Sequence, residues 1–270
     1  MYRSFFGLQD RPFGKTPNPA FLYESSRHRE ALARLEYAVD EKDLAVLTGP
    51  IGSGKTTLSR ALIDRIGDSR PVVLLINPRV TARQLLAAVA TGLDVPPTRF
   101  RSEIVDRLHA RLYQLHEQQR EPVLIIDESQ LIPGKAVFDE IRLLTNFQLD
   151  DQNLLSVILI GQPELEKRLA RPAYEPLNQR VGIRYTLEAL GPDETREYVD
   201  HRIRVAGGKT NPFSEESIQA LFDFSRGVPR IINTLATTAL LAAFGDDEKR
   251  IGAERIREAA REHRIAEAGA

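Results

Sequence analysis

The chain has 270 residues, which is enough for one large domain or for a core with a smaller domain, and it contains no cysteine. Disulfides and thiolate metal sites are therefore excluded, and a formal net charge of −1 confines any nucleic-acid-binding surface to a local patch. Because no apolar run approaches the roughly 20 residues that span a bilayer, and the N-terminus lacks the apolar core of a signal peptide, we expect a cytoplasmic protein without a transmembrane segment.

The first 26 residues are rich in aromatic side chains and are interrupted by Pro12, Pro17 and Pro19. Proline removes a backbone donor and breaks helices, so this segment cannot form a long helix. The apolar spacing that follows predicts a helix over about residues 27–41, with its apolar face turned inward.

A complete phosphate-loop motif, G-x-x-x-x-G-K-[ST], follows a short apolar run suited to a buried strand over 44–47. Its glycines allow successive backbone N–H groups to surround phosphates at a helix N-terminus. Lys55 supplies a positive charge to the β- and γ-phosphates, and the Thr56 hydroxyl can ligate Mg²⁺. The sequence therefore predicts that a nucleoside triphosphate is bound by Gly49, Pro50, Ile51, Gly52, Ser53, Gly54, Lys55, Thr56 and Thr57.

Another strand is expected over 72–76, with helices over 82–92 and 102–119. An apolar strand over 123–126 then ends in Asp127 and Glu128, the Walker B arrangement. Neighbouring side chains on a strand point to opposite faces, so we expect the two carboxylates to act differently. Asp127 is the candidate Mg²⁺ ligand, and Glu128 is the candidate base for the attacking water. Hydrolysis as well as binding is therefore expected.

Later apolar runs predict a helix over 135–147 and strands over 154–160 and 181–185. Strands that alternate with helices predict an α/β fold, a parallel sheet between helices. After residue 190 only helices are expected, over 193–205, 215–225, 229–244 and 253–263, which predicts a small all-helical domain. The expected organisation is an N-terminal segment over 1–26, a nucleotide-binding core over 27–190 and a helical lid over 191–270.

Three further polar residues stand at the ends of predicted elements. Gln162 ends a strand, where its side chain could reach the water or the γ-phosphate, and Arg180 precedes the last strand of the core. Arg230 lies on the first turn of a helix that begins with Pro229, a position that helices tolerate. Their order after the two Walker motifs is that of sensor 1, arginine finger and sensor 2 in AAA+ ATPases, which this chain resembles.

Within that class the chain resembles the general secretion pathway protein A (ExeA) type of ATPase. The resemblance covers nearly the whole chain and rests on these motifs: Phe5-Phe6-Gly7-Leu8, Pro12-Phe13, Thr16-Pro17-Asn18-Pro19, Phe21-Leu22-Tyr23, His28-Arg29-Glu30-Ala31-Leu32, Ile160-Gly161-Gln162-Pro163-Glu164-Leu165 and Gly227-Val228-Pro229-Arg230. It implies a P-loop AAA+ core with a helical lid, and an N-terminal segment near the adenine. Gln162 would be sensor 1, Arg230 sensor 2, and Arg180 a finger that acts on a neighbouring subunit.

The resemblance also implies a homo-oligomer, ring or filament, that uses ATP and Mg²⁺ to assemble or remodel a partner. Relatives of this type serve secretion, pilus and envelope assembly. Since the sequence ends after the lid, we expect no direct anchoring in the envelope.

Other interpretations are weaker or remain open. A two-lobed helicase would need a second motor domain, and a GTPase would need an Asn-Lys-x-Asp signature that the chain lacks. Residues 207–210 resemble the end of a phosphate loop, but we interpret them as a turn after a helix of the lid. Similar ATPases help transposases to select target DNA, so a DNA-binding ATPase is the alternative function. Its candidate contacts to duplex DNA are Arg79, Arg83, Arg99 and Arg101.

Overall fold

The structure is a computed structural model that describes residues 1–14, 18–96, 98–149 and 152–266. Thr16 and Pro17 of the N-terminal motif lie outside the described residues. The chain divides into two compact units. The α/β unit comprises residues 28–49 and 58–187, and the helical unit comprises residues 1–27, 50–57 and 188–270.

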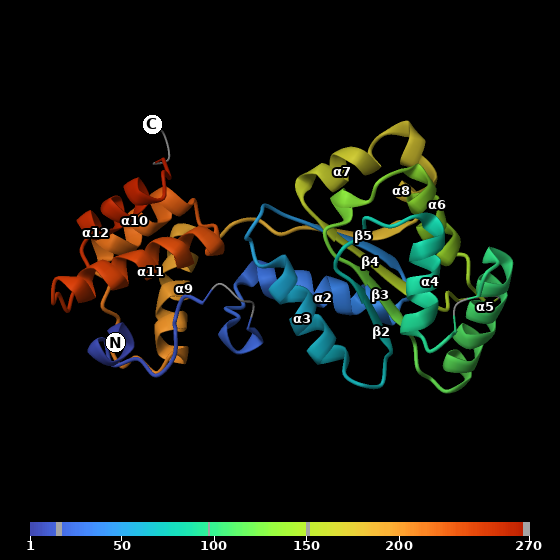
Figure 1. Cartoon of the computed structure of the whole chain (residues 1–270), viewed down its shortest axis with the longest axis horizontal. Coiled ribbons are helices and arrows are strands. Elements are labelled where there is room, and N and C mark those ends of the chain that lie inside the picture. Colours follow the sequence, from blue (N-terminus) through green and yellow to red (C-terminus); the bar gives the residue numbers. More distant parts are fainter. Residues whose placement is uncertain (15–17, 97, 150–151, 267–270) are drawn as a thin grey trace. The chain divides into compact units, whose positions relative to one another are not determined.

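A five-stranded parallel sheet forms the centre of the α/β unit, with the strand order β2-β3-β4-β1-β5 (Figure 1). Because every strand runs in the same direction, the carboxyl ends of all strands meet at one edge, where ligands of open α/β sheets bind. The strands are β1 (Leu44–Thr48), β2 (Val72–Leu75), β3 (Val123–Ile126), β4 (Ser156–Gly161) and β5 (Val181–Thr186).

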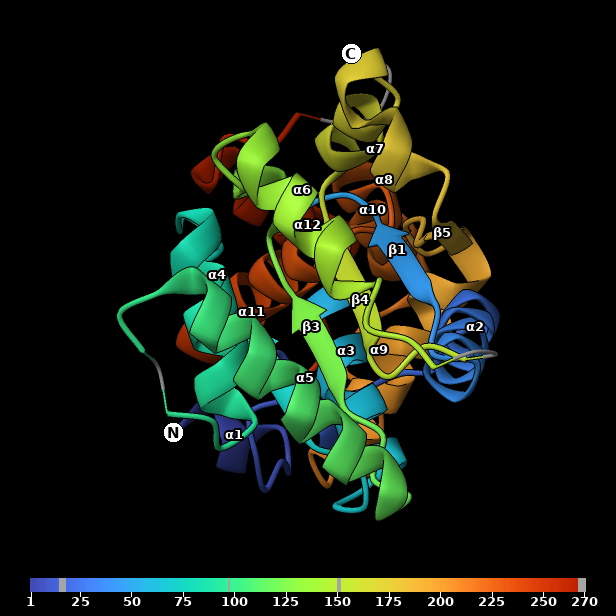
Figure 2. The same cartoon turned by 90° about the vertical axis from the view of Figure 1, so that its right-hand side faces the viewer.

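Helices cover both faces of this sheet, as the two views show (Figures 1 and 2). On one face lie α2 (Ser26–Asp40) and α3 (Lys55–Ile66). On the other lie α4 (Ala82–Gly92), α5 (Arg101–Glu117) and α6 (Lys135–Leu144). Strands β1, β3 and β4 are buried along their whole length, which explains why they read as continuous apolar runs.

Local capping explains why some helices begin where the sequence predicts. The Thr81 hydroxyl accepts the Gln84 N–H at 3.3 Å, and the Gln84 side chain accepts the Thr81 N–H at 2.8 Å. This capping box satisfies two backbone donors at the start of α4. The expected helix over 82–92 is confirmed with both of its bounds.

Short helical segments follow the carboxyl ends of β3 and β4, and the periodicity of the sequence does not predict them. Each spans too few residues to display a helical repeat of apolar positions. They are η2 (Ser129–Leu131), α7 (Pro163–Leu169), η3 (Pro172–Tyr174) and α8 (Glu175–Asn178).

The helical unit contains the four helices expected after residue 190. They are α9 (Pro192–Val205), α10 (Glu215–Ser225), α11 (Pro229–Gly245) and α12 (Ala253–Glu262). The N-terminal segment, with α1 (Tyr2–Phe5) and η1 (Pro19–Phe21), belongs to the same unit. Its Leu8, Phe13 and Phe21 side chains are buried in one apolar core with residues of α9 to α12. Two segments from opposite ends of the sequence therefore form a single core.

Arg202 on α9 holds the N-terminal segment in place within the helical unit. Its guanidinium donates hydrogen bonds to the carbonyl oxygens of Pro12, Gly14 and Phe21. Its Cζ lies 4.9 Å from the centre of the Phe21 ring and 5.5 Å from that of Tyr198. Burial lowers the pKa of Arg202 from its ordinary value. The charge is compensated by carbonyl dipoles and aromatic faces, so this contact has a structural role.

The predicted fold class is confirmed: a parallel α/β sheet between helices, followed by a helical region. The motif-like residues 207–210 lie in the turn after α9, as expected, and Gly207 has a φ of +85°. Among the described residues, none of the helices has the length and apolar character needed to cross a membrane.

Candidate functional site

The phosphate loop lies between β1 and α3, with Lys55 as the first residue of the helix. Gly52 and Gly54 have φ angles of +82° and +102°, a region that side chains disfavour and glycine adopts at little cost. The Lys55 side chain is 8% exposed, and its Nζ donates a hydrogen bond to the Pro50 carbonyl oxygen at 2.8 Å. The ammonium group therefore lies folded over the loop, within the region where phosphates bind in this motif.

The loop also contains a buried hydroxyl without a partner. Ser53 is 1% exposed, and its Oγ has no hydrogen-bond partner among the described residues. Unpaired buried polar atoms are costly, and a phosphate oxygen is an acceptor that would satisfy this hydroxyl. The loop residues therefore fit a bound phosphate chain.

Arg230 is joined to the same loop within the helical unit. Its backbone N–H donates a hydrogen bond to the Gly52 carbonyl oxygen at 3.2 Å. A Cβ at position 52 would lie 2.5 Å from the Cβ of Arg230, so only glycine permits this approach. The preceding turn needs glycine as well, because a Cβ at Gly227 would lie 1.8 Å from the Leu190 carbonyl oxygen. The sequence placed Arg230 on the first turn of a helix, and the structure places it as the second residue of α11, against the loop.

The two Walker B acids follow β3, but they do not alternate as strand residues. Asp127 is 3% exposed, and its Oδ1 accepts the N–H of Glu128 at 2.8 Å. Glu128 has φ +53° and ψ 36°, a left-handed conformation. The expectation that strand alternation separates the two carboxylates is therefore wrong. A backbone turn separates them, because the strand ends at Ile126.

The Glu128 carboxylate is held by two amide side chains. Gln130 on η2 donates its amide N–H to Glu128 Oε2, and Gln162 donates to the same oxygen at 3.4 Å. Gln130 Oε1 in turn accepts the backbone N–H of Gln162 at 3.0 Å. The structure therefore brings the predicted base and the predicted sensor together. Gln130 was not among the predicted site residues, although its position two residues after Glu128 was a possible signal.

Arg180 lies between α8 and β5 and is exposed. One of its Nη atoms donates to Thr145 Oγ1 at 3.1 Å and lies 3.5 Å from the Thr145 carbonyl oxygen. Thr145 is the C-cap of α6, so Arg180 bonds to the end of that helix. An exposed arginine held by a single residue remains accessible to a second molecule.

Each unit contains some of the predicted site residues. Gly49, Asp127, Glu128, Gln162 and Arg180 belong to the α/β unit, whereas the remaining loop residues and Arg230 belong to the helical unit. The part of the chain that the structure describes contains no cluster of three or more His, Asp or Glu side chains suited to a metal ion. Mg²⁺ commonly uses one or two protein ligands together with substrate phosphates, and the candidates Thr56 and Asp127 match that mode.

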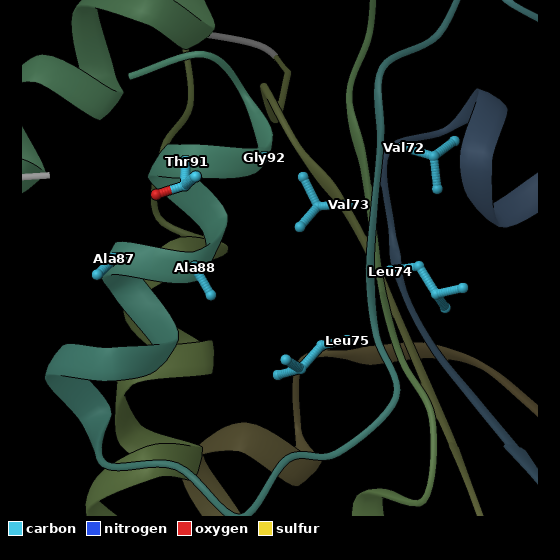
Figure 3. A pocket seen from close by; sticks show the side chains of 8 residues that line it. All are labelled: Val72, Val73, Leu74, Leu75, Ala87, Ala88, Thr91 and Gly92. Carbon is cyan, nitrogen blue, oxygen red and sulfur yellow. The ribbon is translucent and has the colours of Figure 1, made fainter. Parts of the chain in front are cut away.

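A groove beside the edge strand β2 has a different chemistry (Figure 3). Among the described residues that line it, Thr91 is the one with a polar side chain, and none is a predicted site residue. Such a surface does not suit a phosphate group. The groove is lined by Val72, Val73, Leu74, Leu75, Ala87, Ala88, Thr91 and Gly92.

Two of the four arginines considered for DNA have partners within the chain. Arg101 forms a bidentate ion pair with Glu140, at 2.8 Å, and Glu140 is 5% exposed. Arg83 donates to the carbonyl oxygens of Thr98 and Arg99. Arg79 and Arg99 are exposed. Arg83 and Arg101 are exposed as well, so all four arginines lie at the surface and two of them also have structural contacts.

Comparison with known proteins shows which proteins this chain is similar to. Residues 39–169 match the AAA domain family. The chain is 39% identical over 255 residues to "General secretion pathway protein A" of Aeromonas hydrophila, a match that covers 93% of the chain and 46% of that protein. It is 25% identical over 228 residues to "Holliday junction branch migration complex subunit RuvB" of Kosmotoga olearia, covering 82% of the chain and 60% of the relative. The resemblance expected from the motifs is confirmed.

Solved structures show the same fold. The ORC2 protein of Aeropyrum pernix superposes with a TM-score of 0.70 at 16% identity, over 94% of this chain and 71% of that one. Thermotoga maritima RuvB superposes with a TM-score of 0.59 at 21% identity, over 87% of this chain and 67% of that one. The chain spans about half the length of the secretion relative, so the activity of that whole protein is not transferred by the match.

Proposed function

We propose, from the premise that this chain is an AAA+ protein similar to general secretion pathway protein A, that it is an oligomeric Mg²⁺-dependent ATP hydrolase. It would use ATP binding and hydrolysis to assemble or remodel a partner of a secretion or envelope-assembly system. We place this activity in the cytoplasm, where its substrate ATP is made.

The hydrogen bond between Arg230 and Gly52 carries the proposal. The Gly52 backbone belongs to the loop that would surround the phosphates, and Arg230 belongs to the first turn of α11. A change in the loop on loss of the γ-phosphate would therefore alter the start of a helix in the lid. Such a connection turns nucleotide hydrolysis into movement of a helical element.

The chemistry would be divided among residues already described. Lys55 and the loop N–H groups would bind the β- and γ-phosphates, and the orphaned Ser53 hydroxyl would donate to a phosphate oxygen. Thr56 and Asp127 would hold Mg²⁺, whose charge would offset that of the phosphates. Glu128 would take a proton from the attacking water as the bond between the γ-phosphorus and the β-γ bridging oxygen breaks, releasing ADP and phosphate.

A DNA-binding ATPase that acts in transposition target selection is the second candidate. The observation that favours it is the exposure of Arg79 and Arg99, which leaves both side chains accessible to phosphates.

Lysine substitutions test the proposed ATP site. Lys55→Ala should abolish ATP binding, because the loop then loses the charge that neutralises the β- and γ-phosphates. Lys209→Ala is the matched control, since Lys209 is exposed in the sequence that imitates a phosphate loop. Binding of a fluorescent ATP analogue, in competition with ATP and GTP, measures both variants. Equal loss in the two variants, or unchanged binding in Lys55→Ala, would refute the assignment.

A further inference from the structure

The Glu128 carboxylate accepts a hydrogen bond from Gln130, which also contacts other parts of the α/β unit. The residue between them is Ser129, which is fully buried and whose Oγ donates to the Ile126 carbonyl oxygen at 2.8 Å. This bond fixes the turn that leads out of β3. Gln130 is therefore presented on a rigid backbone, beside the carboxylate that the proposed reaction uses.

The Gln130 side chain makes two hydrogen bonds in opposite directions. Its amide nitrogen donates to Glu128 Oε2, and its Oε1 accepts the Gln162 N–H at 3.0 Å. Because the amide group is planar, its position is fixed by the backbone after β4 and in turn fixes the carboxylate after β3. Gly161 leaves the necessary space, since a Cβ there would lie 2.9 Å from Gln130 Oε1.

An arginine on α7 restrains the backbone of Gln130. Arg168 on α7 donates to the carbonyl oxygens of Gln130 and Ile132. Its Cζ lies 4.9 Å from the centre of the Phe138 ring and 5.4 Å from that of Tyr174. These aromatic contacts hold the guanidinium in place, so η2 has little freedom to carry Gln130 away.

The two amide side chains donate hydrogen bonds to the same oxygen of Glu128. Gln130 and Gln162 bond to Oε2, and Oε1 has no hydrogen-bond partner in the described ranges of the chain. A carboxylate anchored through one oxygen keeps the other available to accept a proton. This is the geometry of an oriented base, and loss of orientation by about 1 Å can cost about 100-fold in rate.

We propose that Gln130 is a positioning residue, which orients Glu128 for proton abstraction and ties it to Gln162. This inference rests on the proposed ATP hydrolysis. In the step concerned, the water oxygen bonds to the γ-phosphorus, its proton passes to Glu128 Oε1, and ADP leaves with the electrons of the broken bond.

Single-turnover hydrolysis with enzyme in excess over ATP tests this role. Gln130→Ala should lower the rate by about 10- to 100-fold with ATP affinity within about twofold of wild type, because only the orientation of the base changes. Gln130→Glu keeps an acceptor for the Gln162 N–H and removes the donor to Glu128. Its rate of hydrolysis should therefore fall by as much as that of Gln130→Ala, or by more. Gln114→Ala, at an exposed position on α5, is the matched control and should keep the wild-type rate.

A double mutant separates positioning from a general structural effect. In a Glu128→Gln background, Gln130→Ala should cause no further loss, since a residue that acts through Glu128 has nothing left to orient. A further loss of tenfold, or a Gln130→Ala rate equal to or above wild type, would overturn the inference. If Glu128→Gln itself turns over ATP like wild type, the proposed function fails instead, and the two failures are distinguishable.

Discussion

The α/β unit and the helical unit use partly buried polar groups in opposite ways. In the helical unit the Arg202 guanidinium donates to three carbonyl groups and lies over two aromatic rings, so its donors are used to hold two chain segments together. In the α/β unit the hydrogen bonds that the described residues make to the Glu128 carboxylate both end on Oε2. A polar group whose hydrogen bonds join chain segments supports the fold, whereas one that is anchored on one side is available for chemistry. Substitutions in the two units should therefore have different consequences.

The largest effect is expected from Arg180, which we propose acts on the nucleotide of a neighbouring subunit. Arg180→Ala should lower turnover by about 10³- to 10⁵-fold, the range for a finger supplied in trans. Because Arg180 is exposed and bonds only to Thr145 among the described residues, folding should be unaffected. Mixing Arg180→Ala with Lys55→Ala should restore part of the activity, since one kind of interface then pairs an intact site with an intact finger.

Protein concentration gives an independent check of the shared site. Turnover per subunit should rise with concentration in the wild type. Arg120→Ala, at an exposed position after α5, should behave like wild type. Turnover that is independent of concentration, with no rescue in the mixture, would mean that the site is complete in one subunit.

Arg202 should show the opposite behaviour, a loss of stability. Arg202→Ala leaves the Pro12, Gly14 and Phe21 carbonyl groups without this donor, and the free energy of unfolding should fall by about 3 kcal/mol. The melting temperature should then fall by roughly 5–10 °C. Arg204→Ala, at an exposed position on the same helix, should melt within about 1 °C of wild type. Equal melting temperatures of the two variants in differential scanning calorimetry would contradict the structural role assigned to Arg202, and with it the difference between the units.

The smallest effect concerns duplex DNA. If the alternative function holds, ATP-bound protein should bind DNA, with an affinity that falls as salt rises. Alanine at Arg79 or Arg99 should then lower the salt slope by about one unit for each phosphate contact. Arg83→Ala and Arg101→Ala should change it less, because both side chains have partners within the chain. Fluorescence anisotropy at several salt concentrations measures the slope. Absence of binding at low salt would favour the secretion-type function over the DNA-binding one.

Contiguous motifs made much of this molecule predictable. The phosphate loop and the acids after β3 are local patterns, and buried strands read as apolar runs whatever their neighbours are. Helix α10 begins after Ser214, whose hydroxyl accepts the Ser217 N–H, so its expected span of 215–225 is confirmed.

Contacts between distant segments were not predictable in the same way. The contact of Arg202 with Pro12 joins residues 190 positions apart, and no periodicity signals it. The left-handed turn at Glu128 was also missed, because non-glycine residues adopt it rarely. Gln130 could be recognised only when that turn placed its amide beside the carboxylate.

The central claim, that Glu128 activates water for ATP hydrolysis, is tested most directly by Glu128→Gln in single-turnover assays with parallel measurement of ATP binding. The variant should bind ATP with wild-type affinity and lose about 10²- to 10⁴-fold in hydrolysis, because an amide cannot accept the proton of water. Hydrolysis at the wild-type rate in this variant would contradict the account.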